Sequence, residues 1–164
     1  MERRELLKWG AVAGGTIFFG DASRLGGSTA SAAGKMLEQC LKANQQYAAT
    51  FKEGKLPLPP AKKLAAVACM DARLMVDQFL GLKNGDAHVI RNAGGLVTDD
   101  AMRSLVISYH LLGTREFFVV QHTDCGMLTF EEDAVKKQIA KATNSDTSAL
   151  RLYPFKNLEE NVKA

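Results

Sequence analysis

Three short apolar runs, each ending in a cluster of polar residues, constrain the fold of this chain most strongly. They cover residues 63–69, 87–91 and 116–121. Near-continuous apolar runs of this length are typical of strands that are buried on both faces, as in parallel sheets. Helical patterns separate the runs, and alternating strands and helices favour an α/β fold. We therefore expect a parallel β-sheet core flanked by helices.

Helices are predicted over residues 34–54, 74–80 and 99–112, where apolar residues recur at helical spacing. The last of these has the clearest boundaries, because Thr98 can cap its start and Gly113 can end it. Its predicted buried stripe consists of Met102, Leu105, Val106, Tyr109 and Leu112. A proline-rich connector follows the first helix.

The N-terminal segment, residues 1–33, differs in character from the rest of the chain. It begins with a basic stretch containing Arg3 and Arg4, continues with an uncharged apolar run, and ends in small residues. This order is typical of an export signal, and the paired arginines favour the twin-arginine type. We expect two parts, an export signal over 1–33 and one domain over 34–164. The expected location is therefore periplasmic or otherwise outside the cytoplasm.

Bulk composition excludes several classes of function. The net charge is only +3, from 21 basic and 18 acidic residues, so a nucleic-acid partner is not expected. No apolar run reaches the roughly 18 residues of a membrane-spanning helix, so no stable span is expected after signal removal. Three cysteines without a C-x-x-C pair support neither a disulfide framework nor a thioredoxin-like site.

Polar residues with metal-binding side chains follow two of the predicted strands. Cys69 ends the first strand, and His122 and Cys125 follow the third. Ligand sites in open α/β sheets lie at the carboxyl ends of the strands, so these side chains converge if the two strands are neighbours. Two thiolates and an imidazole suit zinc, and three protein ligands leave the open position of a catalytic site. We expect one zinc ion per chain.

The other cysteine and histidines have structural interpretations. Cys40 lies on the apolar stripe of the first predicted helix and is expected to contribute to packing. His88 lies in a strand and His110 on a helix, and neither belongs to a ligand-spaced cluster. We predict that none of the three binds the metal.

Asp71 and Arg73 alternate with Cys69 along the chain. If the segment is extended, this spacing puts all three side chains on one side. A carboxylate beside a guanidinium stays ionised and is oriented by bidentate hydrogen bonds. Asp71 and Arg73 are therefore the candidate catalytic residues, although a plain surface ion pair is the alternative.

The sequence resembles the β-class carbonic anhydrases in three segments. They are Cys-Met-Asp-Ala-Arg at 69–73, Arg-Asn-Ala-Gly-Gly at 91–95, and His-Thr-Asp-Cys at 122–125. The resemblance covers about residues 36–130. Within the family, the sequence looks most similar to the small bacterial and archaeal branch. The resemblance implies zinc-dependent, reversible hydration of carbon dioxide to bicarbonate and a proton, by attack of zinc-bound hydroxide. It also implies that Asp71 orients the hydroxide, that Arg73 holds Asp71, and that the chain forms a homodimer or larger homo-oligomer.

Several alternatives stay open at this point. The family includes carbon disulfide and carbonyl sulfide hydrolases with the same ligands, and in some members the equivalent of Asp71 closes the zinc site. The backbone at Gly94 and Gly95 either approaches the site closely or forms a plain turn. A non-catalytic zinc-binding remnant is a further possibility.

The resemblance also implies a strand order of second, first, third, with a further strand beside the third. No such strand follows in this sequence, so residues 116–121 are expected to form an unprotected apolar edge. We expect a C-terminally incomplete domain, poorly soluble or weakly active when expressed alone. Addition of a helix and strand from a close relative should then restore a stable dimer.

Overall fold

The computed structural model describes residues 30–163, and its residues fall into two compact units divided after Lys55. The first unit contains helix α2 (Ala30–Thr50). This helix starts four residues before the predicted start, because Ala30, Ala32 and Ala33 are strong helix formers. It ends where the Thr50 hydroxyl donates to the carbonyls of the preceding turn. The export signal predicted for residues 1–33 lies almost entirely outside the described residues.

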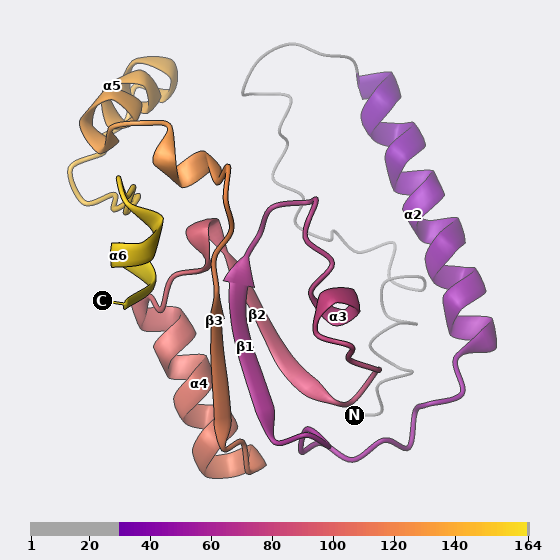
Figure 1. Cartoon of the computed structure of the whole chain (residues 1–164). Helices are drawn as coiled ribbons and strands as arrows, with labels where there is room; N and C mark the ends of the chain where they lie inside the picture. Colours follow the sequence, from indigo (N-terminus) through magenta and orange to yellow (C-terminus); the bar gives the residue numbers. More distant parts are fainter. Residues whose placement is uncertain (1–29, 164) are drawn as a thin grey trace. The chain divides into compact units, whose positions relative to one another are not determined.

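The second unit contains a parallel three-stranded sheet, which confirms the predicted fold class. Its strands are β1 (Leu64–Cys69), β2 (Ala87–Asn92) and β3 (Glu116–Val120). Their order is β2-β1-β3, as expected, and β1 pairs in parallel with both neighbours (Figure 1). The central position of β1 therefore brings the ends of β1 and β3 side by side.

Helical segments connect and follow the strands. They are α3 (Val76–Phe79), the 3-10 turn η2 (Ala93–Gly95), α4 (Asp99–Leu112), the 3-10 turn η3 (Gly126–Leu128), α5 (Glu132–Thr143) and α6 (Leu158–Lys163). Gly113 ends α4 in the left-handed conformation, as predicted, whereas Thr98 occupies the N-cap position without a capping side-chain hydrogen bond. Among the described helices, none has the length and apolar character needed to cross a membrane.

Burial of the strands differs from the prediction that all three are enclosed on both faces. Every residue of β1 is buried, but β2 is only half-buried and β3 is largely exposed. The reason is position in the sheet, because β1 has a strand on each side and β3 forms an edge. Phe117, Phe118 and Val119 are 42%, 45% and 39% exposed, so the expected apolar edge is present among the described residues.

The buried stripe predicted for α4 is wrong for three of its five residues. Ala101 and Ser108 are buried, and Leu105 and Leu112 of the predicted stripe are half-buried, whereas its other members Met102, Val106 and Tyr109 are exposed. Small residues face the sheet because α4 contacts β1 and β2, and β1 is rich in alanine. The buried Ser108 hydroxyl lies 2.6 Å from both the Thr114 hydroxyl and His88 Nδ1. Hydrogen bonds thus satisfy the polar groups that take the place of the expected apolar stripe.

Glu132, the first residue of α5, connects this helix to the segment before α6. Its Oε2 accepts hydrogen bonds from the backbone amides of Leu152 and Tyr153, each at 3.1 Å. Its Oε1 lies 2.6 Å from Lys136 Nζ. The hydrogen bond from Lys136, followed by those from the two amides, lowers the pKa of Glu132.

We expect the Glu132 contacts to stabilise the fold only while the carboxyl group is ionised. A pKa lowered in the folded state adds stability above the unfolded-state pKa, and that stability is lost as the pH falls through the folded-state pKa. Glu132→Gln should therefore lower the midpoint of thermal unfolding at about pH 7, and the difference should shrink toward about pH 3. Glu159→Gln is the control, since Glu159 pairs only with exposed Lys163. A deficit that does not change with pH would contradict this assignment.

Candidate metal centre

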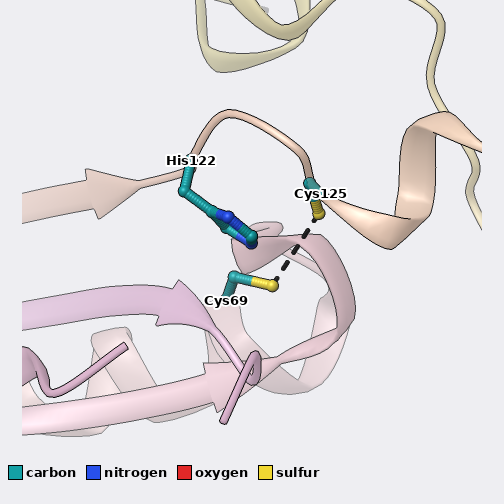
Figure 2. Close-up of side chains that lie close together, drawn as sticks. All are labelled: Cys69, His122 and Cys125. Atoms are coloured by element: carbon teal, nitrogen blue, oxygen red, sulfur yellow. Dashed lines mark hydrogen bonds between the residues drawn. The ribbon is translucent and has the colours of Figure 1, made fainter. Parts of the chain in front are cut away.

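The three predicted ligands converge at the carboxyl end of the sheet. Cys69 is the last residue of β1, and His122 and Cys125 lie in the loop between β3 and η3. One ligand atom from each residue lies within 4.8 Å of the others, and Figure 2 shows the three side chains pointing toward a common point. Both cysteines are buried, and His122 is half-buried. The prediction that these side chains meet is confirmed.

The donor geometry fits a zinc ion. Cys69 Sγ and Cys125 Sγ lie 3.9 Å apart. Two zinc–sulfur bonds of about 2.3 Å at a tetrahedral angle place their sulfurs about 3.8 Å apart. His122 Nε2 is buried without a hydrogen-bond partner, which is costly for a polar atom unless a ligand satisfies it. The residues present therefore suit the metal that their chemistry predicts.

The tautomer of His122 is also set for metal binding. His122 Nδ1 lies 2.8 Å from the carbonyl oxygen of Thr123. A carbonyl can only accept, so Nδ1 carries the proton and Nε2 presents its lone pair to the two sulfurs. A hydrogen bond of this kind to the second ring nitrogen fixes the orientation of a metal-binding imidazole.

The two thiols differ in their electrostatic surroundings. Burial raises the pKa of Cys69, but the Asp71 amide, the His122 side chain, the Gly94 amide and the Cys125 side chain together outweigh it, and the net pKa is lowered. Burial, together with the neighbouring Cys69 sulfur, raises the pKa of Cys125 despite a hydrogen bond from the Met127 amide. A divalent cation at this position would favour ionisation of both thiols.

Asp71 and Arg73 form the pair predicted from the sequence. Asp71 Oδ1 accepts from Arg73 Nε at 3.0 Å and from the Arg73 backbone amide at 2.9 Å, and Oδ2 accepts from Nη2 at 2.7 Å. The side-chain hydrogen bonds from Arg73, then its backbone amide, hold the pKa of Asp71 far below its usual range. Asp71 Oδ2 lies 3.8 Å from His122 Nε2. The carboxylate thus faces the ligand group in its ionised form.

Arg91 was quoted in the sequence pattern but had no predicted role. Its Nε and Nη2 donate to the Cys69 carbonyl at 3.0 and 2.9 Å, and Nη2 also donates to the Asp71 carbonyl at 2.6 Å. It therefore fixes the backbone on both sides of Met70 from the neighbouring strand. Only the pairing of β1 with β2 reveals this contact.

The open question about Gly94 and Gly95 is decided in favour of close approach. A Cβ on Gly95 would lie 2.6 Å from the Val120 carbonyl oxygen and 2.8 Å from the Cys69 nitrogen. Both glycines have positive φ, at 81° and 64°. This backbone therefore packs directly against the ends of the two strands that carry the ligands.

An apolar layer supports the ligands from the C-terminal part of the second unit. Met127 and Phe155 are buried in one cluster with Cys69 and Cys125. The Phe155 amide donates to the Met127 carbonyl at 3.2 Å. Phe155 precedes α6 (Leu158–Lys163) and packs behind the site.

The remaining cysteine and histidines lie outside the ligand group. Cys40 is exposed, so its predicted packing role is wrong. Helix α2 has no buried residue among those whose side chains are described. His88 hydrogen-bonds to Ser108, and the His110 ring lies edge-on to Tyr109, in keeping with structural roles.

Comparisons with known proteins identify relatives of this chain. A family model described as carbonic anhydrase matches residues 64–161, more than half of the chain. Beta-carbonic anhydrase 1 of Mycobacterium tuberculosis is 61% identical over 100 residues, which cover 61% of this chain and 61% of that protein. Carbon disulfide hydrolase of Acidithiobacillus thiooxidans is 39% identical over 122 residues, covering 73% and 59% of the two chains.

A solved structure gives the same result for the fold. The crystal structure of carbonic anhydrase from Streptococcus mutans superimposes with a TM-score of 0.72 at 46% identity, covering 77% of this chain and 76% of that one. The chain spans about three fifths of the length of the two curated relatives. From the matched family model, the shared sheet and the ligand motifs, we conclude that this chain belongs to the β-class carbonic anhydrase family.

Proposed function

We propose that this protein catalyses the zinc-dependent, reversible hydration of carbon dioxide to bicarbonate and a proton. The observation that carries the proposal is the group of Cys69, His122 and Cys125 with the ionised Asp71 carboxylate beside it. A zinc ion held by these three residues supplies Lewis acidity that makes water a nucleophile near neutral pH. The relatives named as carbonic anhydrases support the same reaction.

Asp71 determines the orientation of the nucleophile in this proposal. Two hydrogen bonds from Arg73 occupy its Oδ1, whereas Oδ2 receives one and keeps acceptor capacity on the side of His122. An ionised carboxylate can only accept, so Oδ2 selects a nucleophile that carries a proton and directs its lone pair toward carbon. The proton released in each turnover then passes to buffer.

Arg73 keeps Asp71 in this position rather than on the metal. The guanidinium contacts both carboxylate oxygens, and Asp71 is not part of the three-residue ligand group. Two strong contacts to Arg73 compete with a move of the carboxylate onto a cation. We therefore propose that the site is open, with its fourth position accessible to water.

Loss of Arg73 should reduce turnover more than metal content. Arg73→Ala frees Asp71 to rotate away or to occupy the fourth position, and we expect a fall of at least about tenfold in kcat with zinc still bound. Zinc content and stopped-flow hydration rates, measured on the same preparation, check this. Arg103→Ala is the matched control, since it breaks an exposed Asp–Arg pair on α4. Turnover equal to that of the control would mean that the Asp71–Arg73 contact is only a surface ion pair without a role in catalysis.

Hydrolysis of carbon disulfide or carbonyl sulfide is the second candidate function. The 39% identical relative named carbon disulfide hydrolase favours it. One experiment separates the candidates, in which zinc stoichiometry is measured beside carbon dioxide hydration and beside sulfide release from carbon disulfide. Hydration with one zinc per chain supports our proposal. Zinc with sulfide release and no hydration favours the second candidate, and a chain without zinc is a non-catalytic remnant.

We also propose that the chain works as a homodimer or larger homo-oligomer. Tyr109 on α4 and Phe117 on β3 are both exposed, and their rings lie 6.2 Å apart. The apolar surface therefore continues from the helix to the edge strand, which is typical of a protein–protein contact. Light scattering should give a molar mass of at least twice that of one chain. Phe117→Glu should lower the measured molar mass toward that of a single chain.

Export is the proposal for residues 1–33, which carry Arg3 and Arg4. The twin-arginine route transports folded proteins and so suits one that binds its metal first. Replacement of both arginines by lysine should leave the uncut precursor in the cytoplasm, as detected by fractionation and immunoblotting. Processing and location identical to wild type would refute this proposal.

A further inference from the structure

One guanidinium connects the two loops that carry the metal ligands. Arg73 follows Cys69 in the turn after β1, whereas Asp124 lies between His122 and Cys125. Arg73 Nη1 donates to Asp124 Oδ2 at 2.9 Å, and Nη2 donates to the Asp124 carbonyl at 3.1 Å. The sequence alone gave no indication of this contact, because the two residues are far apart along the chain.

The same guanidinium also holds Asp71 through Nε and Nη2. Arg73 therefore uses all three of its nitrogens on two carboxylates and one carbonyl. One carboxylate follows the ligand Cys69 at the end of β1, and the other lies between the ligands His122 and Cys125. A planar guanidinium fixes the mutual orientation of such partners better than a single point charge does.

The backbone at Asp124 directs its side chain into this contact. Its φ is 57°, in the left-handed region where aspartate and asparagine are the best tolerated residues with side chains. The turn that brings Cys125 back toward Cys69 passes through this residue. The conformation of the ligand loop and the position of the Asp124 carboxylate are thus set together.

We propose that Asp124 is a positioning residue, which acts through Arg73 to tie the Cys69 loop to the His122–Cys125 loop and to fix Asp71 beside the ligand group. The effect on turnover rests on the proposed function. The effect on metal retention rests only on the metal centre, because two ligand loops that are cross-linked lose less entropy on binding and separate less readily.

The ion pair between Arg73 and Asp124 is largely exposed to solvent. The side chains of Arg73 and Asp124 are 61% and 84% exposed. An isolated exposed ion pair contributes little to stability, so removal of Asp124 should have little effect on unfolding. The distinguishing effect is local, on the separation of the loops, and appears in zinc release rather than in the stability of the apo-protein.

The experiment uses Asp124→Asn, which keeps the left-handed backbone and the shape of the side chain but removes its charge. Asp100→Asn is the matched control, because Asp100 forms an exposed ion pair with Arg103 at the same 2.9 Å. Zinc-loaded full-length chains are mixed with an excess of a chromogenic chelator, and the rate of zinc release is followed by absorbance. Thermal unfolding of each apo-protein and carbon dioxide hydration are measured on the same preparations.

We expect Asp124→Asn to release zinc about fivefold faster than wild type and to lower kcat by a similar factor. The unfolding midpoint of its apo-protein should match that of Asp100→Asn, and Asp100→Asn should retain wild-type release and turnover. Equal zinc release from the two variants would overturn the proposal. Faster zinc release from Asp124→Asn would also overturn the proposal if its apo-protein unfolded at a clearly lower temperature than that of Asp100→Asn. Asp124 would then be only a structural turn residue.

The result also distinguishes this inference from the proposed function. A wild-type chain that loads zinc but does not hydrate carbon dioxide would refute the function and leave the release experiment decisive for Asp124. A wild-type chain that takes up no zinc would refute both.

Discussion

Cys69→Ser, His122→Ala and Cys125→Ser should each reduce zinc affinity by more than about 100-fold, the upper range for loss of a residue that only supports a ligand. A serine hydroxyl does not ionise near neutral pH, and alanine offers no donor atom. Two remaining ligands then have to hold the ion, although the site is built from three atoms within 4.8 Å of each other. Carbon dioxide hydration should fall with the zinc content. Zinc per chain, measured by elemental analysis after dialysis, checks the expectation.

Cys40→Ser is the matched control for the two cysteine variants. Cys40 is the one cysteine outside the ligand group, and it is exposed. Its replacement should leave one zinc per chain, which separates loss of a ligand from general loss of a thiol. Full zinc occupancy in any of the three ligand variants would remove that residue from the ligand set.

Gly95→Ala should have the second largest effect, on both stability and metal content. The new Cβ would lie 2.6 Å from the Val120 carbonyl oxygen and 2.8 Å from the Cys69 nitrogen, and both are backbone atoms that cannot rotate away. The residue would also have to adopt a φ of 64°. Overpacking and left-handed strain together should cost about 3 kcal/mol or more, a large part of the roughly 5–15 kcal/mol that stabilises a domain.

The metal should be lost from Gly95→Ala because relief of the clash separates the ends of β1 and β3. Gly113→Ala is the matched control, since Gly113 has a φ of 75° but no atom within 4 Å of the added Cβ. It should cost only the conformational strain, about 1–2 kcal/mol, and should keep its zinc. Chemical unfolding and zinc analysis of both variants provide the measurement. Equal losses of stability would mean that the close approach at Gly95 has no effect of its own.

Much of the fold was predictable because its signals are local. The three apolar runs correspond to β1, β2 and β3 within one residue at each end, and the glycine after α4 ends it as expected. Strand and helix formation depend on patterns of side chains that are close together along the chain, and such patterns can be identified in a single sequence. Strand order was expected only through the family resemblance, and the observed order agrees with it.

Burial was predicted less well, because it depends on which elements become neighbours. The α4 stripe was chosen by hydrophobicity, yet Ala101 and Ser108 face the sheet and Tyr109 is exposed. The all-buried β1 contains four small residues, so α4 can approach it only with small residues of its own. In the same way, the apolar residues of β3 are exposed because this strand lies at the edge.

The sequence by itself determined the chemistry of this protein, namely which side chains are thiols, imidazoles and carboxylates, and that they follow strands. Only the tertiary structure decided which of them meet. The pairing of β1 with β3 brings Cys69 to His122 and Cys125, the return of the chain after β2 packs Gly95 against both strands, and Arg73 reaches Asp124 across the two loops. The physical reason is that a side chain's chemistry is fixed by its own residue, whereas contact between distant residues depends on how strands pair and how closely backbones approach.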